Sequence, residues 1–384
     1  MWPRAGRLER AAPELTVEVL AGGVEVIDRL AHEWRVLCSE GPCAEPFYRP
    51  EWVAAYLRAF EPDAKLVVVI ARADGRLRGV LALVRERGTI NGVPARKLRS
   101  AANSHSCQFD LVHGVRDAAE VADLIWRALR DVPGWDVIEL RDAPSDGATS
   151  LLLEAARRDE HLVGAWRRSP MPYLALPAAD GGPERALAHL SSRHRRMLRG
   201  NRRKLEDLGP LTFTRAPGPD RATLDRFYEL EGAGWKGEQG SAIACAPERR
   251  RFYDVLARTE GLRDAVTIYT LTCGGEPVAM QYGLTQGGTF FGLKAAYDER
   301  FARFSPGQLL LEDVTLDLYS RGLRVFDFMG ESDDLKSRWC TAERALASYF
   351  VFHRRPTGLL LHFWKFRVLT AARRLKHRLR RPAT

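Results

Sequence analysis

The segment from residue 297 to residue 339 constrains the fold of this chain more than any other stretch. Ser305 followed by Pro306 predicts the start of a helix, because serine caps helices and proline is favoured at the first helical position. Apolar residues then recur at helical spacing until Gly322, which predicts the end of the helix. A strand is expected next, at residues 325–328. The segment therefore predicts a helix–strand unit of an α/β fold.

Both ends of this unit carry groups that suit an anion. The N–H groups at the helix start lack intrahelical partners, Gly307 lets a ligand approach the backbone closely, and Arg303 adds positive charge. After the strand, Gly330 is followed by Lys336, whose ammonium is expected to face the same anion. Phosphate is the obvious candidate. An ordinary helix cap and a solvated surface lysine are the alternatives.

Two sequence blocks in this order resemble a known family of enzymes. The first is EGAGWKGEQGSAI at residues 231–243, and the second joins the SPG helix start to the FDFMG…K ending at residues 305–336. They resemble GNAT-fold acyltransferases of the CelD-like group, also called BioF2-like acetyltransferases. The second block also resembles the Fem-type aminoacyl and peptidyl transferases, which are tandem GNAT proteins. The resemblance covers about residues 185–353 well and the first half of the chain weakly.

The resemblance implies a carrier site for an acyl donor, most simply acetyl-CoA. In GNAT enzymes the carrier pyrophosphate sits on the helix start, and Lys336 matches a lysine of the Fem-type transferases. The usual GNAT pattern has glycine three residues after the arginine, whereas Gly307 follows Arg303 by four. This departure leaves room for an acyl carrier protein or an aminoacyl-tRNA as the donor. The residues expected to bind the carrier are Arg303, Ser305, Gly307, Gln308, Gly330 and Lys336.

Acyl transfer to an amine needs a proton acceptor for the amine and a proton donor for the leaving group. Glu231 is the first candidate base, with Asp327 as the competing carboxylate, and Tyr297 is expected to protonate a leaving thiolate. Trp235 lies four residues after Glu231 and is expected on the same helix face, where it and Lys236 line the acceptor pocket. The alternatives are a surface glutamate at a helix end and packing roles for the two aromatic residues.

A polar loop at residues 103–110 is the main candidate in the first half of the chain. Its His105 and Asp110 are expected to help bind the acceptor. The neighbouring Cys107 lacks a visible base-orienting context for a nucleophile. A plain connecting loop is the alternative. Because the first half has no SPG-like block, we expect a degenerate half that shapes the acceptor cleft.

An internal repeat indicates that the two halves are similar. A hairpin predicted around Asp74-Gly75 superposes on one around Gly274-Gly275 at an offset of 200 residues. Chance similarity of two hairpins is the alternative. The predicted fold class is α/β, with tandem GNAT-like domains, mixed and mostly antiparallel sheets flanked by helices, and a basic C-terminal helix.

Linker composition at residues 177–183, PAADGGP, predicts the boundary between these halves. The expected division is a degenerate GNAT-like domain at 1–180, an acyltransferase domain at 181–355 and a basic amphipathic tail at 356–384. Further strands are expected at 66–71, 77–85, 211–215, 265–272, 277–284 and 289–296, and further helices at 184–207 and 221–232.

The net charge of +10 is concentrated at the C-terminal end of the chain. From Arg344 onward there are eleven Lys or Arg and no Asp or Glu, so removing these charges from +10 leaves −1. Apolar residues recur there at helical spacing, a pattern typical of a basic amphipathic helix on an anionic membrane surface or in contact with RNA. A helix packed on the body, with a frayed basic end, is the alternative. The apolar positions are Phe363, Phe366, Leu369, Ala372 and Leu375.

Composition argues against several classes of protein. No apolar run approaches the roughly 18 residues of a membrane span, and the opening MWPRAGRLER lacks the apolar core of a secretory signal. Six cysteines without a CxxC pair argue against a zinc site or a disulfide scaffold. We therefore expect a cytoplasmic protein without a bound metal, with peripheral contact at the inner face of the membrane through its tail.

Together these features predict a GNAT-type N-acyltransferase. It would move an acyl group, most simply acetyl from acetyl-CoA, to an amine or hydroxyl of a polar acceptor such as a sugar, peptide or envelope precursor. The envelope link comes from the resemblance alone. Two rival interpretations stay open. In one, a Fem-type transferase uses aminoacyl-tRNA and contacts it through seven Lys or Arg at residues 193–204. In the other, a non-catalytic accessory protein of polysaccharide synthesis docks on a membrane through its tail.

Overall fold

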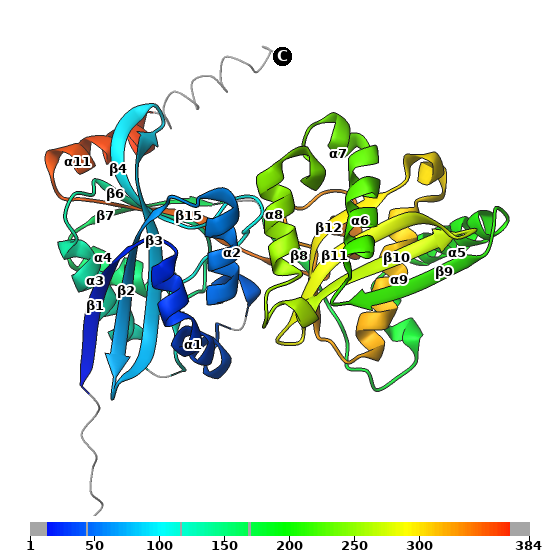
Figure 1. Ribbon diagram of the computed structural model, residues 1–384, viewed down its shortest axis with the longest axis horizontal. Coiled ribbons are helices and arrows are strands. Elements are labelled where there is room, and N and C mark those ends of the chain that lie inside the picture. The colour runs from blue at the N-terminus through cyan, green and yellow to red at the C-terminus, as the bar shows by residue number, and fades with distance from the viewer. Residues whose placement is uncertain (1–13, 44, 116, 168–169, 369–384) are drawn as a thin grey trace, which may run out of the picture.

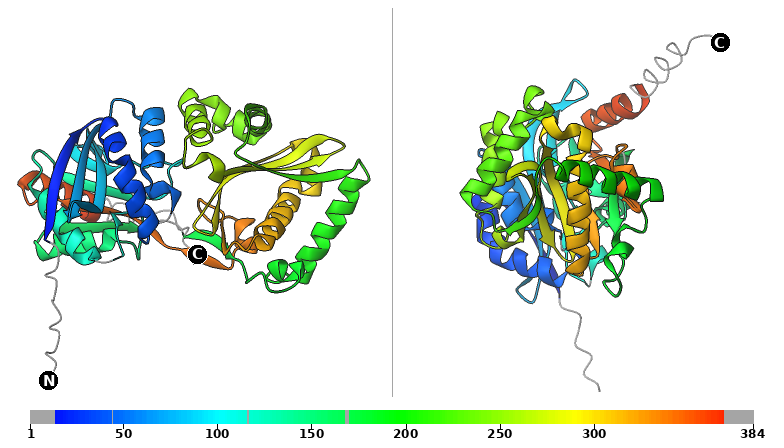
Figure 2. Two further views of the ribbon diagram at one scale, coloured as in Figure 1. Left: turned by 60° about the horizontal axis from the view of Figure 1, so that its bottom comes forward. Right: turned by 90° about the vertical axis from the view of Figure 1, so that its right-hand side faces the viewer.

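A computed structural model describes residues 14–43, 45–115, 117–167 and 170–368. The chain forms two units that lie side by side, each a sheet with helices on both faces (Figure 1 and Figure 2). Among these residues both sheets are mostly antiparallel, and each contains one parallel pair of strands. The predicted fold class, mixed α/β with two mostly antiparallel sheets flanked by helices, is therefore confirmed.

The first unit contains a sheet in the order β1-β2-β3-β4-β6-β15-β7, with the short β5 beside β3. Its strands are β1 (Leu15–Gly22), β2 (Lys65–Ala73), β3 (Arg76–Ile90), β4 (Val93–Ser100), β5 (Val112–His113), β6 (Val137–Pro144), β7 (Leu162–Arg167) and β15 (Leu346–Phe352). Its helices are α1 (Glu25–Glu40), α2 (Pro50–Phe60), α3 (Ala118–Asp131) and α4 (Thr149–Arg158). Because side chains alternate along a strand, Val67 and Val69 of β2 pack in the core under α3 and α4, whereas Leu66 and Val68 pack under α1 and α2.

The second unit contains a sheet in the order β9-β10-β11-β12-β13-β8-β14. Its strands are β8 (Met171–Ala175), β9 (Leu211–Pro217), β10 (Val266–Cys273), β11 (Glu276–Gln286), β12 (Thr289–Tyr297), β13 (Val325–Asp327) and β14 (Ala342–Arg344). Its helices are α5 (Ser192–Glu206), α6 (Arg221–Ala233), α7 (Trp235–Glu238), α8 (Pro247–Leu256), α9 (Pro306–Ser320) and α10 (Lys336–Trp339). Helices α5 and α9 cover one face of the sheet, and α6 and α8 cover the other.

The two units repeat one topology. In each, a meander of three antiparallel strands is followed by a helix, α3 or α9, and then by a strand that pairs in parallel with the third strand of the meander. The hairpin turns at Asp74-Gly75 and Gly274-Gly275 both have positive φ angles, between 50° and 87°, at their two central residues. The predicted internal repeat is therefore confirmed by the topology.

The two units exchange one strand each. β8, which follows β7 in the chain, lies in the second sheet between β13 and β14. β15, near the C-terminal end, crosses to the first sheet and pairs with β6 and β7 (Figure 1). The boundary predicted at residues 180 and 181 therefore does not separate the two sheets, because residues 171–175 and 346–352 each pair across it. This exchange ties the units together through backbone hydrogen bonds.

A shared apolar core also joins the units. Helix α2 of the first unit faces α8 of the second, and the rings of Trp52 and Phe252 meet edge to face with centroids 5.3 Å apart (Figure 1). Phe47 meets Phe291 of β12 in the same way, also at 5.3 Å. Edge-to-face pairs of buried rings favour one fixed arrangement. The junction is therefore a packed interior in which loops of one unit reach the residues of the other.

The predicted helix at 184–207 is interrupted. A 3₁₀ turn occupies Pro183–Leu187, and a new helix, α5, begins at Ser192 because the Ser191 side chain accepts the N–H of His194 at 3.2 Å. The other predicted helices and strands of residues 66–328 are present, and β3 continues beyond its predicted end to Ile90. Within the described residues, no helix has the length and apolar character needed to cross a bilayer.

Candidate functional site

The second sheet opens at the point where β12 and β13 part. Thr289 to Phe291 of β12 pair in parallel with Val325 to Asp327 of β13. β12 then continues to Tyr297, whereas the chain turns away after Asp327 because Met329 and Gly330 adopt left-handed backbone angles, with φ of 50° and 73°. Beyond Phe291, no strand of the described residues pairs with that edge of β12. We call this parting of β12 and β13, next to the start of α9, the opening.

Helix α9 begins at this opening, but its start differs in detail from the prediction. Ser305 has a left-handed backbone, with φ of 53°, and its side chain makes no capping hydrogen bond. Its carbonyl instead accepts the N–H groups of Gln308 and Leu309, at 2.9 and 3.2 Å. The expectation of several free N–H groups is therefore wrong. The N–H of Gly307 is the one between Pro306 and Leu309 for which the described residues supply no acceptor.

The predicted carrier residues gather around this helix start. A Cβ placed on Gly307 would have only Tyr297 within 4 Å, at 3.8 Å, so the space beside Gly307 is open and Tyr297 borders it. The guanidinium of Arg303 lies over the ring of Phe304, 4.6 Å from its centroid. The side-chain oxygen of Gln308 is buried and lacks a hydrogen-bond partner among the described residues. Residues 303–308 thus supply a free backbone donor, a cation and an unsatisfied amide at the start of α9.

Lys336 lies on the other side of the opening and holds the turn after β13. Its ammonium donates hydrogen bonds to the carbonyls of Met329 and Glu331, at 2.8 and 3.0 Å. A Cβ on Gly330 would lie 3.3 Å from the ammonium, so glycine allows this close approach. Burial lowers the pKa of Lys336, and the carboxylate of Asp333 opposes that shift. The role in binding a carrier phosphate stays a prediction.

Asp327 is the last residue of β13, where the strands part, and its side chain is enclosed. Its carboxylate accepts the N–H of Met329 at 2.9 Å and a hydrogen bond from Arg344 Nη1 at 3.1 Å. Burial raises the pKa of Asp327, and the Arg344 charge opposes that shift. The Asp327 side chain thus stabilises the turn after β13 from inside, and its role as the competing base stays a prediction.

Glu231 and Trp235 do not share a helix face. α6 ends at Ala233, Gly234 is extended, and Trp235 begins the separate helix α7. As a result the Trp235 side chain is exposed, whereas the Glu231 side chain has no exposed surface. The i,i+4 prediction fails because glycine at position 234 ends the helix one residue before the second member of the pair.

Glu231 instead anchors the loop that carries the WKGEQGSAI sequence. Its carboxylate accepts the N–H of Ile243 at 2.8 Å and contacts the ammonium of Lys236 at 3.4 Å. The same ammonium donates to the carbonyl of Ala295 on β12 at 2.5 Å. Lys236 therefore joins the loop to β12, which lines the opening. Glu231 holds Lys236 and the Ile243 backbone in place through its buried carboxylate.

Lys294 is the residue at this site that the sequence analysis missed. It lies on β12, three residues beyond the end of the parallel pairing, and its ammonium interacts electrostatically with Glu231, Lys236 and Arg249. Burial lowers the pKa of Lys294, because removal from water disfavours the charged form. A lysine in the otherwise apolar strand sequence FFGLKAAY was the signal that could have identified it.

The first unit contributes the loop at residues 103–110 to the same cluster. His105 Nδ1 and the hydroxyl of Tyr253 on α8 share a hydrogen bond of 3.2 Å, and the His105 ring stacks on Phe60 at 5.5 Å. Burial lowers the pKa of His105 to about 3, and the Lys294 charge adds to that shift. Cys107 interacts electrostatically with both Lys294 and Lys336. Both units therefore contribute residues to the site, and the acceptor-binding role of His105 stays a prediction.

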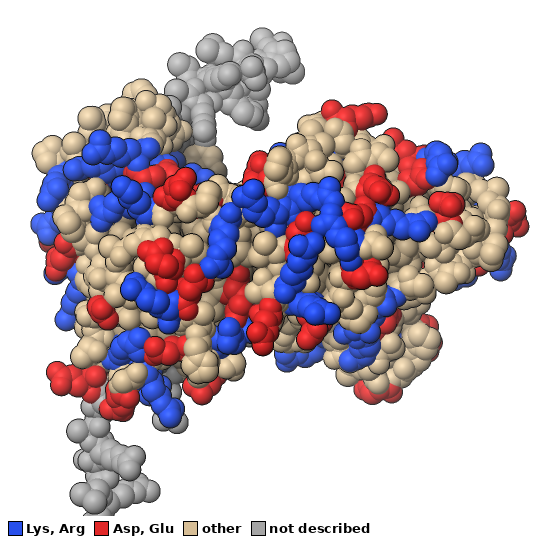
Figure 3. Space-filling model, viewed as in Figure 1, with Lys and Arg blue, Asp and Glu red and all other residues tan. Residues whose placement is uncertain are grey.

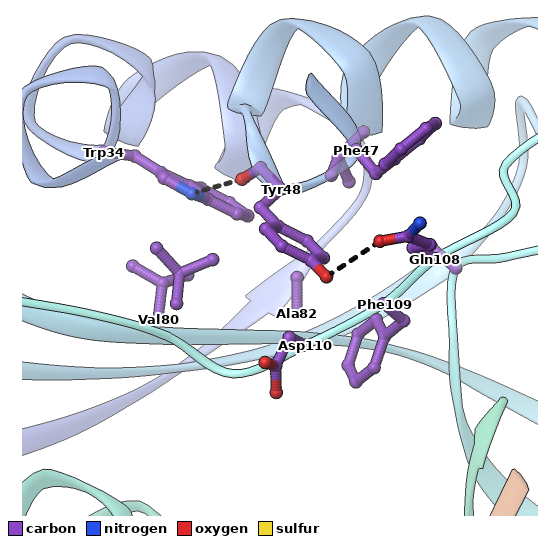
Figure 4. A pocket seen from close by; sticks show the side chains of 11 residues that line it. Trp34, Phe47, Tyr48, Val80, Ala82, Gln108, Phe109 and Asp110 are labelled. Atoms are coloured by element: carbon purple, nitrogen blue, oxygen red, sulfur yellow. Dashed lines mark hydrogen bonds between the residues drawn. The ribbon is translucent and has the colours of Figure 1, made fainter. Parts of the chain in front are cut away.

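Asp110, at the end of this loop, has a structural position. Its carboxylate accepts the backbone N–H groups of Leu111, Ala148 and Thr149 at 2.6 to 3.0 Å, and so holds the start of α4. Burial raises the pKa of Asp110. Figure 4 shows its carboxylate turned away from the side chains of Tyr48 and Gln108. The predicted acceptor contact of Asp110 is therefore wrong, because its oxygens are occupied within the first unit.

A small cavity lies behind the 103–110 loop, between α1, α2 and the first sheet (Figure 4). The Tyr48 hydroxyl donates to the side-chain oxygen of Gln108 at 3.3 Å, and the Trp34 indole N–H donates to the Tyr48 carbonyl at 2.9 Å. Apolar side chains such as Val80 and Phe109 form the rest of its wall. The loop that carries His105 and Cys107 is thus supported from behind by a hydrogen-bonded aromatic cluster.

The buried His105 predicts an acid-sensitive junction. Its pKa is about 3 in the folded chain and about 6.5 when unfolded, so the unfolded chain binds more protons in acid. The stability that results is complete above pH 6.5 and falls as the pH drops toward 3, by about 2 kcal/mol between pH 6.5 and pH 4.5. Urea unfolding at these pH values measures it. His105→Gln should remove this part of the pH dependence, whereas the exposed His32→Gln should keep it; equal pH dependence in the wild type and His105→Gln would contradict the assignment.

Comparison with known proteins agrees with this geometry. Residues 192–337 match the family model of an acetyltransferase (GNAT) domain, a range that includes the opening, the 231–243 loop and Lys336. No curated protein sequence matches the chain.

Several solved structures share the fold over most of the chain. The structure of FemX has a TM-score of 0.58 and 12% sequence identity, covering 86% of this chain and 97% of that chain. The structure of L-PGS from Bacillus licheniformis has a TM-score of 0.51 and 13% sequence identity, covering 87% of this chain and 95% of that chain. The C-terminal domain of a putative lysylphosphatidylglycerol synthetase from Agrobacterium fabrum has a TM-score of 0.50 and 12% sequence identity, covering 87% of this chain and 95% of that chain. Residues 192–337 are thus similar to an acetyltransferase (GNAT) domain, and the two-unit fold of this chain is similar to that of FemX.

Proposed function

We propose that this protein is an acyltransferase that binds an acyl donor in the opening between β12 and β13. The observation that carries the proposal is the parting of these strands after three paired residues, directly beside the start of α9. An extended carrier with amide groups can pair with the unpaired edge of β12, as peptides do when they add to a sheet edge. An anionic part of the carrier can then meet the N–H of Gly307 and the positive end of α9.

Acetyl-CoA is the simplest donor for this opening, because its pantetheine arm carries amides and its other end carries phosphates. Arg303 supplies a cation beside the helix start. The sequence departure between Arg303 and Gly307 keeps an acyl carrier protein and an aminoacyl-tRNA as alternative donors. In each case the bond that breaks joins the acyl carbon to the carrier, and the bond that forms joins it to the acceptor nitrogen or oxygen.

An aminoacyl-tRNA donor is supported by the exposed side of α5. Of the seven basic residues at 193–204, Arg195 donates to carbonyls in and just after the preceding 3₁₀ turn, and Arg202 pairs with Glu312 and Asp313 of α9. The other five are exposed on α5 and are available to a polyanion. They are Arg193, Arg196, Arg199, Arg203 and Lys204. Steep salt dependence of donor binding would favour RNA over acetyl-CoA.

The proton of the attacking amine is proposed to pass to Lys294. Glu231 and Asp327, the carboxylates first considered as bases, are enclosed and already accept two hydrogen bonds each. The pKa of about 3 makes His105 too weak a base at neutral pH. Lys294 has a lowered pKa and lies beside the opening, so its neutral form can accept the proton as the amine attacks the acyl carbon. Protonation of the leaving thiolate by Tyr297 stays a prediction.

The acceptor is proposed to carry negative charge. Lys236, Lys294 and Arg249 meet at the site around one buried carboxylate, that of Glu231, so the cluster has excess positive charge. Figure 3 shows Lys and Arg side chains in a band across the second unit that reaches the junction of the units. Such a field attracts anionic substrates and raises their rate of association. A sugar or peptide acceptor with a carboxylate or phosphate fits this charge.

Calorimetric binding of acetyl-CoA tests the donor site. Gly307→Trp should weaken binding by about tenfold or more, because the indole would fill the open space beside the helix start. The substitution is expected to leave the fold intact, since a Cβ at Gly307 meets nothing closer than 3.8 Å.

Gly200→Trp is the matched control, because Gly200 also lies in a helix and has no neighbour within 4 Å of an added Cβ. It should leave acetyl-CoA binding unchanged. Equal affinity of the wild type and Gly307→Trp would place the donor elsewhere. Absence of acetyl-CoA binding at any salt concentration would remove this donor and move the proposal to an acyl carrier protein or aminoacyl-tRNA.

A further inference from the structure

The helix α11 (Pro356–Phe363) exposes an apolar surface on the first unit, far along the chain from the transfer site. Leu359, Leu360 and Phe363 are 45%, 62% and 57% exposed. Trp166 of β7 is also exposed, at 43%, and the ammonium of Lys365, which follows α11, lies 5.9 Å from its ring. Exposed apolar side chains that lie together mark an interaction site more often than single ones do. We call the exposed side chains of Leu359, Leu360 and Phe363 the α11 surface.

The opposite side of the same segment is firmly packed. Leu361 is buried against the first sheet, and Phe366 packs over Gly164, where an added Cβ would meet its ring at 2.2 Å. The Trp364 indole donates to the carbonyl of Asn91 at 3.3 Å. α11 is therefore fixed in one orientation, and its exposed apolar side chains are held outward by the packing of the others.

The charged residues that directly precede and follow α11 in the sequence are all positive. Arg355 and Arg367 are exposed on either side of α11, and Lys365 lies between them. Arg354 pairs with Glu160 at 3.2 Å. No Asp or Glu follows Glu343 in the sequence, and residues 369–384, which lie outside the described residues, contain six further Lys or Arg. Three of the apolar positions predicted for the tail, Leu369, Ala372 and Leu375, also lie outside the described residues.

We propose that the α11 surface docks on an anionic lipid bilayer. Apolar side chains on a fixed helix enter the boundary between headgroups and acyl chains, and the flanking Lys and Arg contact anionic headgroups. A second copy of this chain is the weaker occupant, because self-association would bring the same cations together across the interface. The inference does not rest on the proposed acyl transfer, because it uses neither the opening nor the lysine cluster.

Vesicle flotation of the full chain tests this surface. At low salt the wild type should float with vesicles of phosphatidylcholine and phosphatidylglycerol, and should stay in the dense fraction with phosphatidylcholine alone. Leu360→Glu combined with Phe363→Glu should lower the bound fraction by about tenfold or more, because each change puts a carboxylate on the bilayer side. Higher salt should also release the wild type.

Leu208→Glu is the matched control, since Leu208 is similarly exposed, at 53%, but lies on the second unit after α5. It should float as the wild type does. Circular dichroism checks the fold of each variant, and Leu360→Ser replaces the double variant if the latter unfolds. Failure of the wild type to float on anionic vesicles, or equal flotation of the wild type and the α11 variants, would overturn the proposal. A dimer in light scattering that the α11 variants disrupt, without flotation, would identify a second copy as the occupant and also overturn it.

Discussion

Replacing Lys294 by methionine is expected to slow acyl transfer by about 100-fold or more, because general-base catalysis commonly contributes 10²–10⁴-fold. Methionine keeps most of the length and packing of the lysine stem but cannot accept a proton. Acetyl-CoA binding should change little, since Lys294 lies on the acceptor side of the opening. Chromatographic detection of CoA released in the presence of a panel of anionic amines measures the rate. Lys65→Met, at an exposed strand residue of the first unit, is the control and should leave the rate unchanged.

The pH dependence of this reaction distinguishes a base from a cation. Burial lowers the pKa of Lys294, so its neutral, proton-accepting form becomes populated below the usual pKa of about 10.4. The wild-type rate should therefore rise with pH and level off at a lower pH than an ordinary lysine would give. Lys294→Arg keeps the positive charge but cannot lose its proton, so it should be as slow as Lys294→Met at every pH. A fast Lys294→Arg enzyme would show that the site needs only the charge and would contradict the base assignment.

Removing the Glu231 carboxylate is expected to cost about 3–5 kcal/mol of unfolding free energy, the range observed when one partner of a buried ion pair is lost. Glu231→Ala leaves the Ile243 N–H without its acceptor and leaves the Lys236 ammonium with only the Ala295 carbonyl. Urea unfolding followed by tryptophan fluorescence measures the loss. Glu238→Ala, at an exposed position of α7, is the control and should stay within about 0.5 kcal/mol of the wild type.

The amide variant separates the two roles considered for Glu231. Glu231→Gln keeps an oxygen for the Ile243 N–H but loses the charge opposite Lys236, so its loss should be smaller, about 1–3 kcal/mol. If Glu231 is a positioning residue, the transfer rate of each Glu231 variant should fall in proportion to its loss of stability. A variant that keeps the loop folded should then keep most of the wild-type rate. Wild-type stability in Glu231→Gln together with a 100-fold slower reaction would instead identify Glu231 as the base and contradict the assignment of Lys294.

Local sequence signals predicted most of the elements. The paired turns at Asp74-Gly75 and Gly274-Gly275 demand positive φ angles that these residues adopt easily, so the hairpins could be located without the structure. Pro306 likewise marked the start of α9, because its ring fixes the backbone angle of a first helical turn. These features depend mainly on a few neighbouring residues, so they can be located without knowledge of the rest of the fold.

The same local reasoning failed where one residue decided between two outcomes. Trp235 was expected to share a helix face with Glu231, but the break at Gly234 turned it out to solvent. Ser305 was expected to cap α9 with its side chain, but its left-handed backbone supplies the carbonyl instead. In both cases the backbone angle at a single position decided the outcome, and the pattern of side chains does not specify that angle.

The sequence by itself determined the repeated hairpins, the α9 unit with its glycine and lysine, and the kind of chemistry that these residues suit. Only the tertiary structure decided which residues meet. The exchange of β8 and β15 has no local signal, because alternation of apolar residues specifies the buried faces of a strand but not its partner. Lys294, His105 and Cys107 come from different units, and the low pKa of Lys294 exists only because packing removes it from water. Burial and long-range strand pairing are properties of the folded chain. They determine which of the candidate residues lie together at one site.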